Sequence, residues 1–169
     1  MKTENKKKKQ KKNGPGIRII FLDIDGVLNS RESITRKKDT HGIYCDLPDM
    51  EHIKHLNKII DDTDARVVIS SCWRHSHTVF GLATILYLCG MRPNVVLDVT
   101  PRVRLSRSRG EEISKWLEDT HYNIKGIVIL DDDRDMNGLL HKLVKIEGQI
   151  GLTYEDAEKA IKIIRSSCE

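Results

Sequence analysis

The sequence contains no apolar run that approaches the roughly 20 residues of a membrane span. The lysines near the N-terminus are not followed by a long apolar stretch, which argues against a secretory signal. The 169 residues are 38% hydrophobic and 32% charged, which is typical of a globular domain with a substantial core. We therefore expect an intracellular, cytoplasmic protein without a membrane partner.

Cysteines are few, and their spacing suggests no pairing. Cys45, Cys72, Cys89 and Cys168 form neither a C-x-x-C motif nor a zinc-ligand pattern. This usage favours reduced thiols in an intracellular compartment. We expect Cys72 and Cys89 to be buried, as unpaired cysteines commonly are.

Positive charge is scarce outside the N-terminal segment. Residues 1–16 hold seven lysines and one glutamate, a net of +6 in a chain of net charge +4, which leaves −2 for residues 17–169. Such a lysine run repels itself, so we expect a disordered tail followed by a folded domain. The tail fits a solubilising segment, a non-specific nucleic-acid arm or a nuclear address, and composition leaves these interpretations open.

Two kinds of apolar segment alternate along residues 17–169. Short runs rich in Ile and Val predict strands, and longer stretches with apolar residues at helical spacing predict helices. The expected strands are 17–22, 65–69, 95–99, 126–130 and 143–146. The expected helices are 49–62, capped by Asp49, then 78–89, 111–120, a short one after 133 and a last one capped by Thr153. Residues 30–48 are polar and are expected to be irregular.

Strands that alternate with helices and are apolar over most of their length favour a parallel sheet covered on both faces. The predicted fold class is α/β, a Rossmann-like three-layer sandwich with roughly five parallel strands. In such sheets, ligands bind beyond the carboxyl ends of the strands. Polar residues follow three of the predicted strands: Asp23 and Asp25, then Ser70, then Asp131 and Asp132.

Four segments carry a family resemblance. They are D-I-D-G-V-L-N at 23–29, V-V-I-S-S at 67–71, R-G-E-E-I at 109–113 and I-L-D-D at 129–132. In this order they resemble the four motifs of the haloacid-dehalogenase superfamily. Those motifs are an aspartate pair with a following glycine, a strand that ends in Ser or Thr, a Lys or Arg before the fourth strand, and an apolar strand that ends in paired acids.

The resemblance implies a Mg²⁺-dependent phosphomonoester hydrolase. It implies that Asp23 attacks phosphorus and forms an aspartyl-phosphate. Asp25 would protonate the leaving oxygen and later activate water. Ser70 would hydrogen-bond a phosphoryl oxygen, and Arg109 would offset the charge of the transferring group.

A metal site follows from the same chemistry. A phosphate monoester is an anion that repels a carboxylate nucleophile, and a divalent cation between them removes much of this repulsion. Mg²⁺ prefers hard oxygen ligands. The resemblance implies that Asp23, Asp131 and the backbone carbonyl of Asp25 bind the ion, while Asp132 holds a metal-bound water or orients a ligand.

Alternatives remain open at individual positions. D-x-D-G also occurs in calcium loops and plain turns, although the downstream acidic ligands of an EF-hand are missing here. Ser71 could replace Ser70 as the phosphate ligand. The candidates that could replace Arg109 are its neighbours Arg102, Arg104 and Arg107.

Three further expectations concern residues near the motifs. Asp133 and Asp135 are expected to cap the next helix. Trp73 is expected to serve packing rather than base stacking. His52 and His55 are expected to be surface residues rather than metal ligands.

The spacing of the motifs bears on the substrate. Only 44 residues separate Asp25 from Ser70, which leaves no room for a large cap domain and predicts an open site, with a flap around residues 30–48. Together, segment 70–74, R-G-E-E-I at 109–113 and L-D-D-D at 130–133 resemble the small, capless phosphatase domains of nucleic-acid repair proteins and polynucleotide 3′-phosphatases. The four arginines between 102 and 109 would suit a polyanion. We expect a phosphorylated substrate, with a nucleic-acid end as the first choice.

Two alternative functions are kept. One is a phosphatase for mononucleotides or small metabolites. The other is a non-catalytic nucleic-acid-binding module on a degenerate fold. Such a module has no need of mutually repelling carboxylates, so Asp23, Asp25 and Asp131 argue against it.

Overall fold

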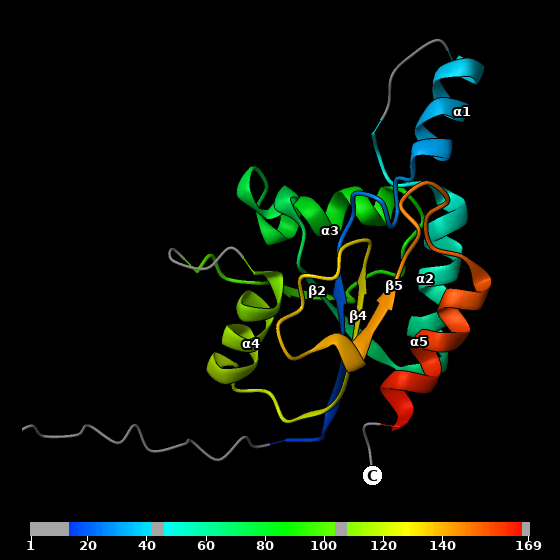
Figure 1. Cartoon of the computed structure of the whole chain (residues 1–169). Coiled ribbons are helices and arrows are strands. Elements are labelled where there is room, and N and C mark those ends of the chain that lie inside the picture. The colour runs from blue at the N-terminus through cyan, green and yellow to red at the C-terminus, as the bar shows by residue number, and fades with distance from the viewer. Residues whose placement is uncertain (1–13, 42–45, 104–107, 167–169) are drawn as a thin grey trace, which may run out of the picture.

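A five-stranded parallel sheet lies between two layers of helices in the computed structural model, which describes residues 14–41, 46–103 and 108–166 (Figure 1). The strands are β1 (Ile17–Leu22), β2 (Ala65–Ile69), β3 (Val96–Val99), β4 (Ile124–Asp131) and β5 (Leu143–Lys145). The α-helices are α1 (Arg31–His41), α2 (Met50–Thr63), α3 (Val79–Leu88), α4 (Arg109–Asp119) and α5 (Tyr154–Ser166), and the 3-10 helices are η1 (Cys72–His75) and η2 (Leu140–Lys142). The α/β class and the parallel sheet are confirmed, and the described residues include no large cap domain.

The strand order is β3-β2-β1-β4-β5, and every pair is parallel. Consecutive strands β1 to β3 run outward on one side of β1, and β4 then returns to its other side. The order therefore reverses between β1 and β4, and such a switch point is where open α/β sheets bind ligands. Asp23 follows β1 and Asp131 ends β4, so both lie at this point.

The alternation of side chains in β1 divides the core into two parts. Ile20 and Leu22 pack on the side covered by α2, α3 and α5, whereas Ile19 and Phe21 pack on the side of α4. Trp116 of α4 meets the Phe21 ring edge-on at a centroid distance of 5.5 Å. Because β1 is buried on both faces, its position is fixed from two sides.

Local capping begins the two helices that pack against each other on one face. The Asp49 carboxylate accepts a hydrogen bond from the Glu51 N–H at the start of α2, at 3.0 Å. At α5 the Thr153 hydroxyl accepts from the Asp156 N–H at 3.2 Å, and Asp156 accepts from Thr153 in return. Both caps were expected from the sequence.

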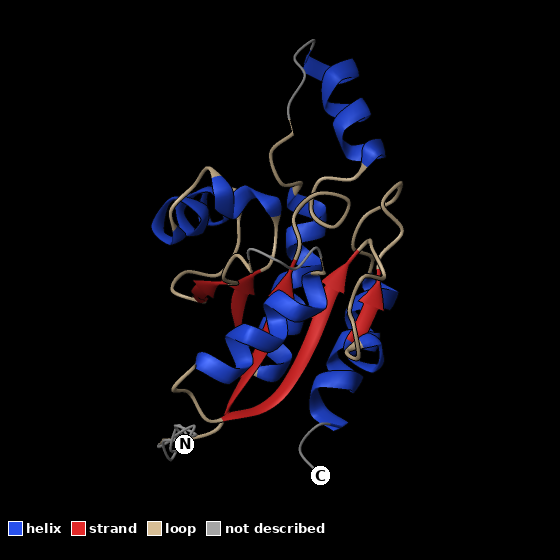
Figure 2. Cartoon of the chain, turned by 60° about the vertical axis from the view of Figure 1, so that its left-hand side comes forward, coloured by secondary structure: helices blue, strands red, loops and turns tan. Residues whose placement is uncertain are grey.

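Residues 31–41 form helix α1, which corrects the expectation of irregular structure over 30–48. Figures 1 and 2 show α1 projecting from the carboxyl edge of the sheet, away from the other helices. Most of its residues are exposed, so the sequence has no apolar stripe to reveal it. The remainder of the expected flap includes residues 42–45, which lie outside the described residues.

The segment after β4 also differs from the expectation. Residues 132–139 form turns rather than a helix, and only a three-residue 3-10 helix, η2, precedes β5. Asp135 caps α4 instead of a following helix, because its carboxylate accepts from the Arg109 N–H and its carbonyl from the Gly110 N–H. Asp133 and Asp135 were expected to cap a helix after β4. Asp135 instead caps α4, which precedes it in the chain by 26 residues at the capped end.

The remaining expectations concern the N-terminal tail and membrane-spanning segments. Residues 1–13 of the expected tail lie outside the described residues, so its disorder stays a prediction. In the described part of the chain, no helix is long and apolar enough to span a membrane.

Gly110 permits a close approach between α4 and the loop after β4. A Cβ atom at this position would collide with the backbone carbonyl group of Met136. We expect Gly110→Ala to lower the free energy of unfolding by about 3 kcal/mol or more, because backbone must move to accommodate the methyl group. Denaturant unfolding measures this change. Lys115→Ala, on the exposed surface of the same helix, is the control and should change it by about 0.5 kcal/mol or less.

Candidate active site

The two buried carboxylates of the site come from neighbouring strands. The Asp23 N–H donates to the Leu130 carbonyl at 3.0 Å, which continues the β1–β4 ladder by one residue. Asp23 is 5% exposed and Asp131 is fully buried. The register of the two strands, rather than any local sequence rule, therefore brings these aspartates side by side.

Arg109 lies between the two carboxylates. Its Nη1 is 3.2 Å from Oδ2 of Asp23, and its Nε is 3.1 Å from Oδ2 of Asp131. The same guanidinium donates to the Ser70 carbonyl, so it joins the ends of β1, β2 and β4. Arg109 begins α4, and the cap by Asp135 and the close packing at Gly110 hold that helix end against the sheet.

Burial dominates the electrostatics of the site. It raises the pKa of Asp131 to about 7, although the charge of Arg109 opposes the shift and that of Asp23 adds to it. Burial also raises the pKa of Asp23, against the effects of Arg109, the Ser71 hydroxyl and the Ile24 N–H. Burial lowers the pKa of Arg109, but the charges of Asp23 and Asp131 outweigh this effect, and the pKa is raised. The Arg109 guanidinium thus faces two buried carboxylates, Asp23 and Asp131. A further positive charge nearby would lower the free energy of keeping both carboxylates ionised.

A third carboxylate completes a cluster that fits a cation. One oxygen each of Asp23, Asp131 and Asp132 lies within 4.8 Å of the other two. Gly26 brings the first motif close to this cluster: it has a φ of +75°, and a Cβ there would collide with the Asp132 carboxylate. Three hard oxygen donors at this spacing suit a divalent cation such as Mg²⁺.

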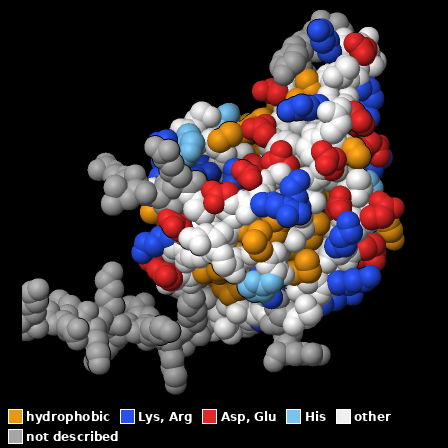
Figure 3. Space-filling model, in the orientation of Figure 1, with side chains coloured by type: hydrophobic (Ala, Val, Ile, Leu, Met, Phe, Trp, Pro, Cys, Tyr) orange, Lys and Arg blue, Asp and Glu red, His pale blue; other side chains and the backbone are white. Residues whose placement is uncertain are grey.

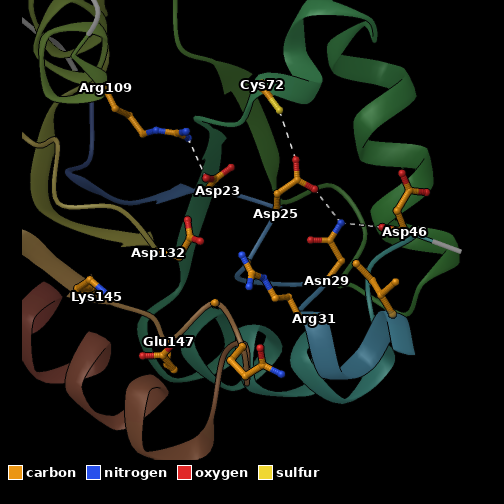
Figure 4. A pocket seen from close by; sticks show the side chains of 14 residues that line it. Asp23, Asp25, Asn29, Arg31, Asp46, Cys72, Arg109, Asp132, Lys145 and Glu147 are labelled. Carbon is orange, nitrogen blue, oxygen red and sulfur yellow. Dashed lines mark hydrogen bonds and ion pairs between the residues drawn. The ribbon is translucent and has the colours of Figure 1, made fainter. Parts of the chain in front are cut away.

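Asp25 lies on the exposed side of the cluster, where three side chains donate to it. Asn29 Nδ2 is 2.8 Å from its Oδ1, and Trp73 Nε1 is 3.1 Å from both of its oxygens. Cys72 Sγ is 3.3 Å from Oδ2 (Figure 4). Cys72 is exposed at the pocket and Cys89 is half-buried, so the expectation that both are buried was wrong. The reason is that η1 turns Cys72 toward the carboxyl edge of the sheet.

The two candidate serines differ in their partners. The Ser71 hydroxyl hydrogen-bonds Asp23 and also accepts from the Trp73 N–H, as the cap of η1. The Ser70 hydroxyl is buried and has no hydrogen-bond partner among the described residues. Ser70 therefore has an unused hydroxyl, whereas the Ser71 hydroxyl is engaged.

Of the two candidate arginines that the structure describes, Arg102 and Arg109, it is Arg109 that contacts the aspartates. Arg102 is exposed and does not line the pocket described below. Arg104 and Arg107 lie outside the described residues. The alternative in which Arg102 takes the place of Arg109 is therefore not favoured by the geometry.

A pocket of about 670 Å³ opens at this edge of the sheet (Figure 4). Sequence reasoning placed Asp23, Asp25, Asp132 and Arg109 in it and missed the others. The missed polar lining residues are Asn29, Arg31, Asp46, Cys72, Lys145, Glu147 and Gln149. A signal was present for Lys145, because it ends β5 at the same edge, in register with Asp131.

His52 is less exposed than expected, and Trp73 makes a contact in addition to the expected packing. His52 is half-buried, with Nδ1 3.0 Å from the Leu152 carbonyl oxygen, so it is neither a free surface residue nor a member of the carboxylate cluster. Trp73 packs against the core, as expected, but it also donates to Asp25.

Fold and site together define an α/β domain of the haloacid-dehalogenase type, with its aspartates at the β1–β4 switch point. A family model described as the HAD domain in Swiss Army Knife RNA repair proteins matches residues 19–157, and the chain belongs to this family. Searches of curated proteins and of solved structures gave no match. Membership supports phosphatase activity of this type in general.

Proposed function

We propose that this domain is a Mg²⁺-dependent phosphomonoester hydrolase that removes a terminal phosphate from a nucleic-acid strand. The observation that carries the proposal is the set of three carboxylates within 4.8 Å at the switch point, with Asp25 and Arg109 beside them in one pocket. Mg²⁺ would be held by Asp23, Asp131, Asp132 and the carbonyl of Asp25, and when bound it would offset the repulsion between nucleophile and phosphate.

The side chains of the domain would carry out the reaction in two steps. In the first, a carboxylate oxygen of Asp23 bonds to phosphorus, the bond to the leaving oxygen breaks, and Asp25 gives that oxygen a proton. In the second, water attacks the aspartyl-phosphate, its proton passes to Asp25, and phosphate leaves with Asp23 restored. The Ser70 hydroxyl and Arg109 would bind phosphoryl oxygens through both steps.

A nucleic-acid end is the proposed substrate because of the family and the access to the site. The matched family is described from RNA repair proteins. The pocket is open to solvent, and α1 beside it is too small to enclose a substrate as a cap domain would. Arg31 of α1 and Lys145 of β5 line the pocket from two sides and could bind phosphates beyond the terminal one.

The experiment is a phosphate-release assay over a panel of substrates, with and without Mg²⁺. The panel holds an aryl phosphate, 3′- and 5′-mononucleotides, and RNA and DNA oligonucleotides with a 3′- or a 5′-phosphate. Preference for an oligonucleotide supports the proposal. Preference for a mononucleotide would move the substrate to small metabolites, and no release from any of them would favour a non-catalytic binding module.

A second pocket, called the groove below, lies at β5 and shares one lining residue with the active-site pocket. It is lined by Lys145, which also lines the pocket, and by Lys159 and Lys162 of α5. Lys159 pairs with Asp156 at 2.9 Å, and Lys162 is exposed. On the face shown in Figure 3, basic side chains lie among acidic ones, so the groove is a local path rather than part of a wide basic surface.

We expect Lys162→Ala to weaken the use of oligonucleotides while sparing mononucleotides, because only a longer strand would reach this lysine. kcat/KM for a phosphorylated oligonucleotide should fall about threefold to tenfold, and the slope of log kcat/KM against log salt should become about 1 unit shallower. Lys115→Ala, on the opposite face of the sheet, should change neither. Equal losses on both substrates would contradict a role of the groove.

A further inference from the structure

We propose that Trp73 and Asn29 are positioning residues that hold the Asp25 carboxyl for proton transfer to the leaving oxygen. The inference rests on the proposed function and concerns two residues to which the resemblance assigns no catalytic role. Both residues touch Asp25 and neither touches the Asp23–Asp131–Asp132 cluster by any hydrogen bond among the described residues.

The Asp25 side chain needs such support because it is exposed. Asp23 and Asp131 are fixed by burial and by Arg109, whereas no ion pair reaches Asp25 within the described residues. Its two oxygens instead accept from the Trp73 indole N–H at 3.1 Å each and from the Asn29 amide at 2.8 Å. The Cys72 thiol is a third and weaker donor, 3.3 Å from Oδ2, so it is the contact that a reacting oxygen would replace.

Each of the two donors is itself held in place. The Trp73 ring stacks on His77 at a centroid distance of 5.7 Å and also packs against the hydrophobic core. The Asn29 amide also donates to the Asp46 carbonyl at 2.7 Å (Figure 4), and Asn29 is 3% exposed. Asp25 therefore accepts from groups whose own orientations are fixed, which is what positions a proton-transferring group well.

This arrangement predicts a dependence on the leaving group. An alkoxide leaving group, such as the sugar oxygen of a nucleotide, needs a proton as its bond to phosphorus breaks. Nitrophenolate leaves without a proton, because its charge spreads over the ring and nitro group. A variant that misplaces Asp25 should therefore lower kcat/KM only for the alkyl phosphate, because kcat/KM covers the steps up to loss of the leaving group and not the later attack of water. Damage to the fold or to Asp23 would lower kcat/KM for both substrates.

The test is Trp73→Phe, which removes the indole N–H and keeps an aromatic ring. With the full chain and Mg²⁺, we expect kcat/KM for an alkyl phosphate or a 3′-phosphorylated oligonucleotide to fall about tenfold, and kcat/KM for nitrophenyl phosphate to change less than about twofold. Trp116→Phe is the matched control, because Trp116 Nε1 also donates to a carboxylate, Asp98 at 2.7 Å, but on the α4 side of the sheet. It should leave the ratio of the two rates unchanged.

Three outcomes would overturn the inference. They are equal losses on both substrates, no loss on either, and an unchanged rate ratio in Asn29→Ala. If Trp73→Phe fails to fold, His77→Ala replaces it, because His77 is exposed and its loss only loosens the Trp73 ring; a ratio change of about threefold is then expected. Failure of the proposed function looks different, since the wild-type protein would then release no phosphate from either substrate.

Discussion

Asp23→Asn is expected to lower kcat by at least about a thousandfold on every substrate that the wild-type protein hydrolyses. Asparagine keeps the size and shape of the side chain, but its amide is not a nucleophile toward phosphorus. The loss should be the same for an aryl phosphate and for an oligonucleotide, because both would pass through the same covalent step. Phosphate release measured on purified wild-type and variant proteins gives this ratio.

The covalent intermediate provides a second test of Asp23 as the nucleophile. Asp25→Asn should still accept phosphate from nitrophenyl phosphate, which needs no acid, but should lack the base that activates water. Acid-quenched Asp25→Asn should therefore carry radiolabelled phosphate that hydroxylamine removes, and Asp23→Asn should carry none. Labelling of Asp23→Asn, or more than about a tenth of wild-type activity in it, would show that Asp23 is not the nucleophile.

Mg²⁺ is expected to raise the melting temperature of the protein by about 5 °C or more at saturating concentration. The reason is that Asp23, Asp131 and Asp132 place three carboxylates within 4.8 Å, while Arg109 pairs with only two of them. A cation that binds the folded cluster and not the unfolded chain stabilises the fold by mass action. Thermal unfolding with Mg²⁺ or with a chelator measures the shift without any substrate.

Two neighbouring aspartates give a matched test of this metal site. Asp132→Asn should lose most of the shift, because it removes a ligand without breaking an ion pair to Arg109. Asp133→Asn should keep the shift, since Asp133 is exposed and lies outside the cluster. An equal shift in both variants would contradict the ligand set, and no shift in the wild-type protein would contradict the site itself.

Much of the fold could be predicted because its signals are local. The apolar runs 17–22, 65–69 and 126–130 correspond to strands β1, β2 and β4, and Asp49 and Thr153 cap the helices that they were expected to cap. A buried strand must be apolar along its whole length, and a helix start needs a side-chain acceptor, whatever surrounds it. Helix α1 was missed because an exposed helix leaves no such pattern.

The site shows where local reasoning ends. The motifs supplied the identities of Asp23, Asp25, Asp131 and Arg109, but the hydrogen bond from Trp73 to Asp25 joins residues 48 positions apart. Likewise, the sequence does not distinguish Ser70 from Ser71 as the phosphate ligand, and only the contacts of their hydroxyls do so.

Sequence information is enough to derive the α/β class, the order of the motifs and the residue types available for phosphate chemistry. It does not reveal which carboxylates lie together, which arginine pairs with them and which donors reach Asp25; these follow from the folded arrangement. The physical reason is that those contacts depend on strand order and register, here the return of β4 to the free side of β1, which places Asp131 beside Asp23. Local propensity fixes where a strand lies in the chain, whereas packing fixes which strand becomes its neighbour.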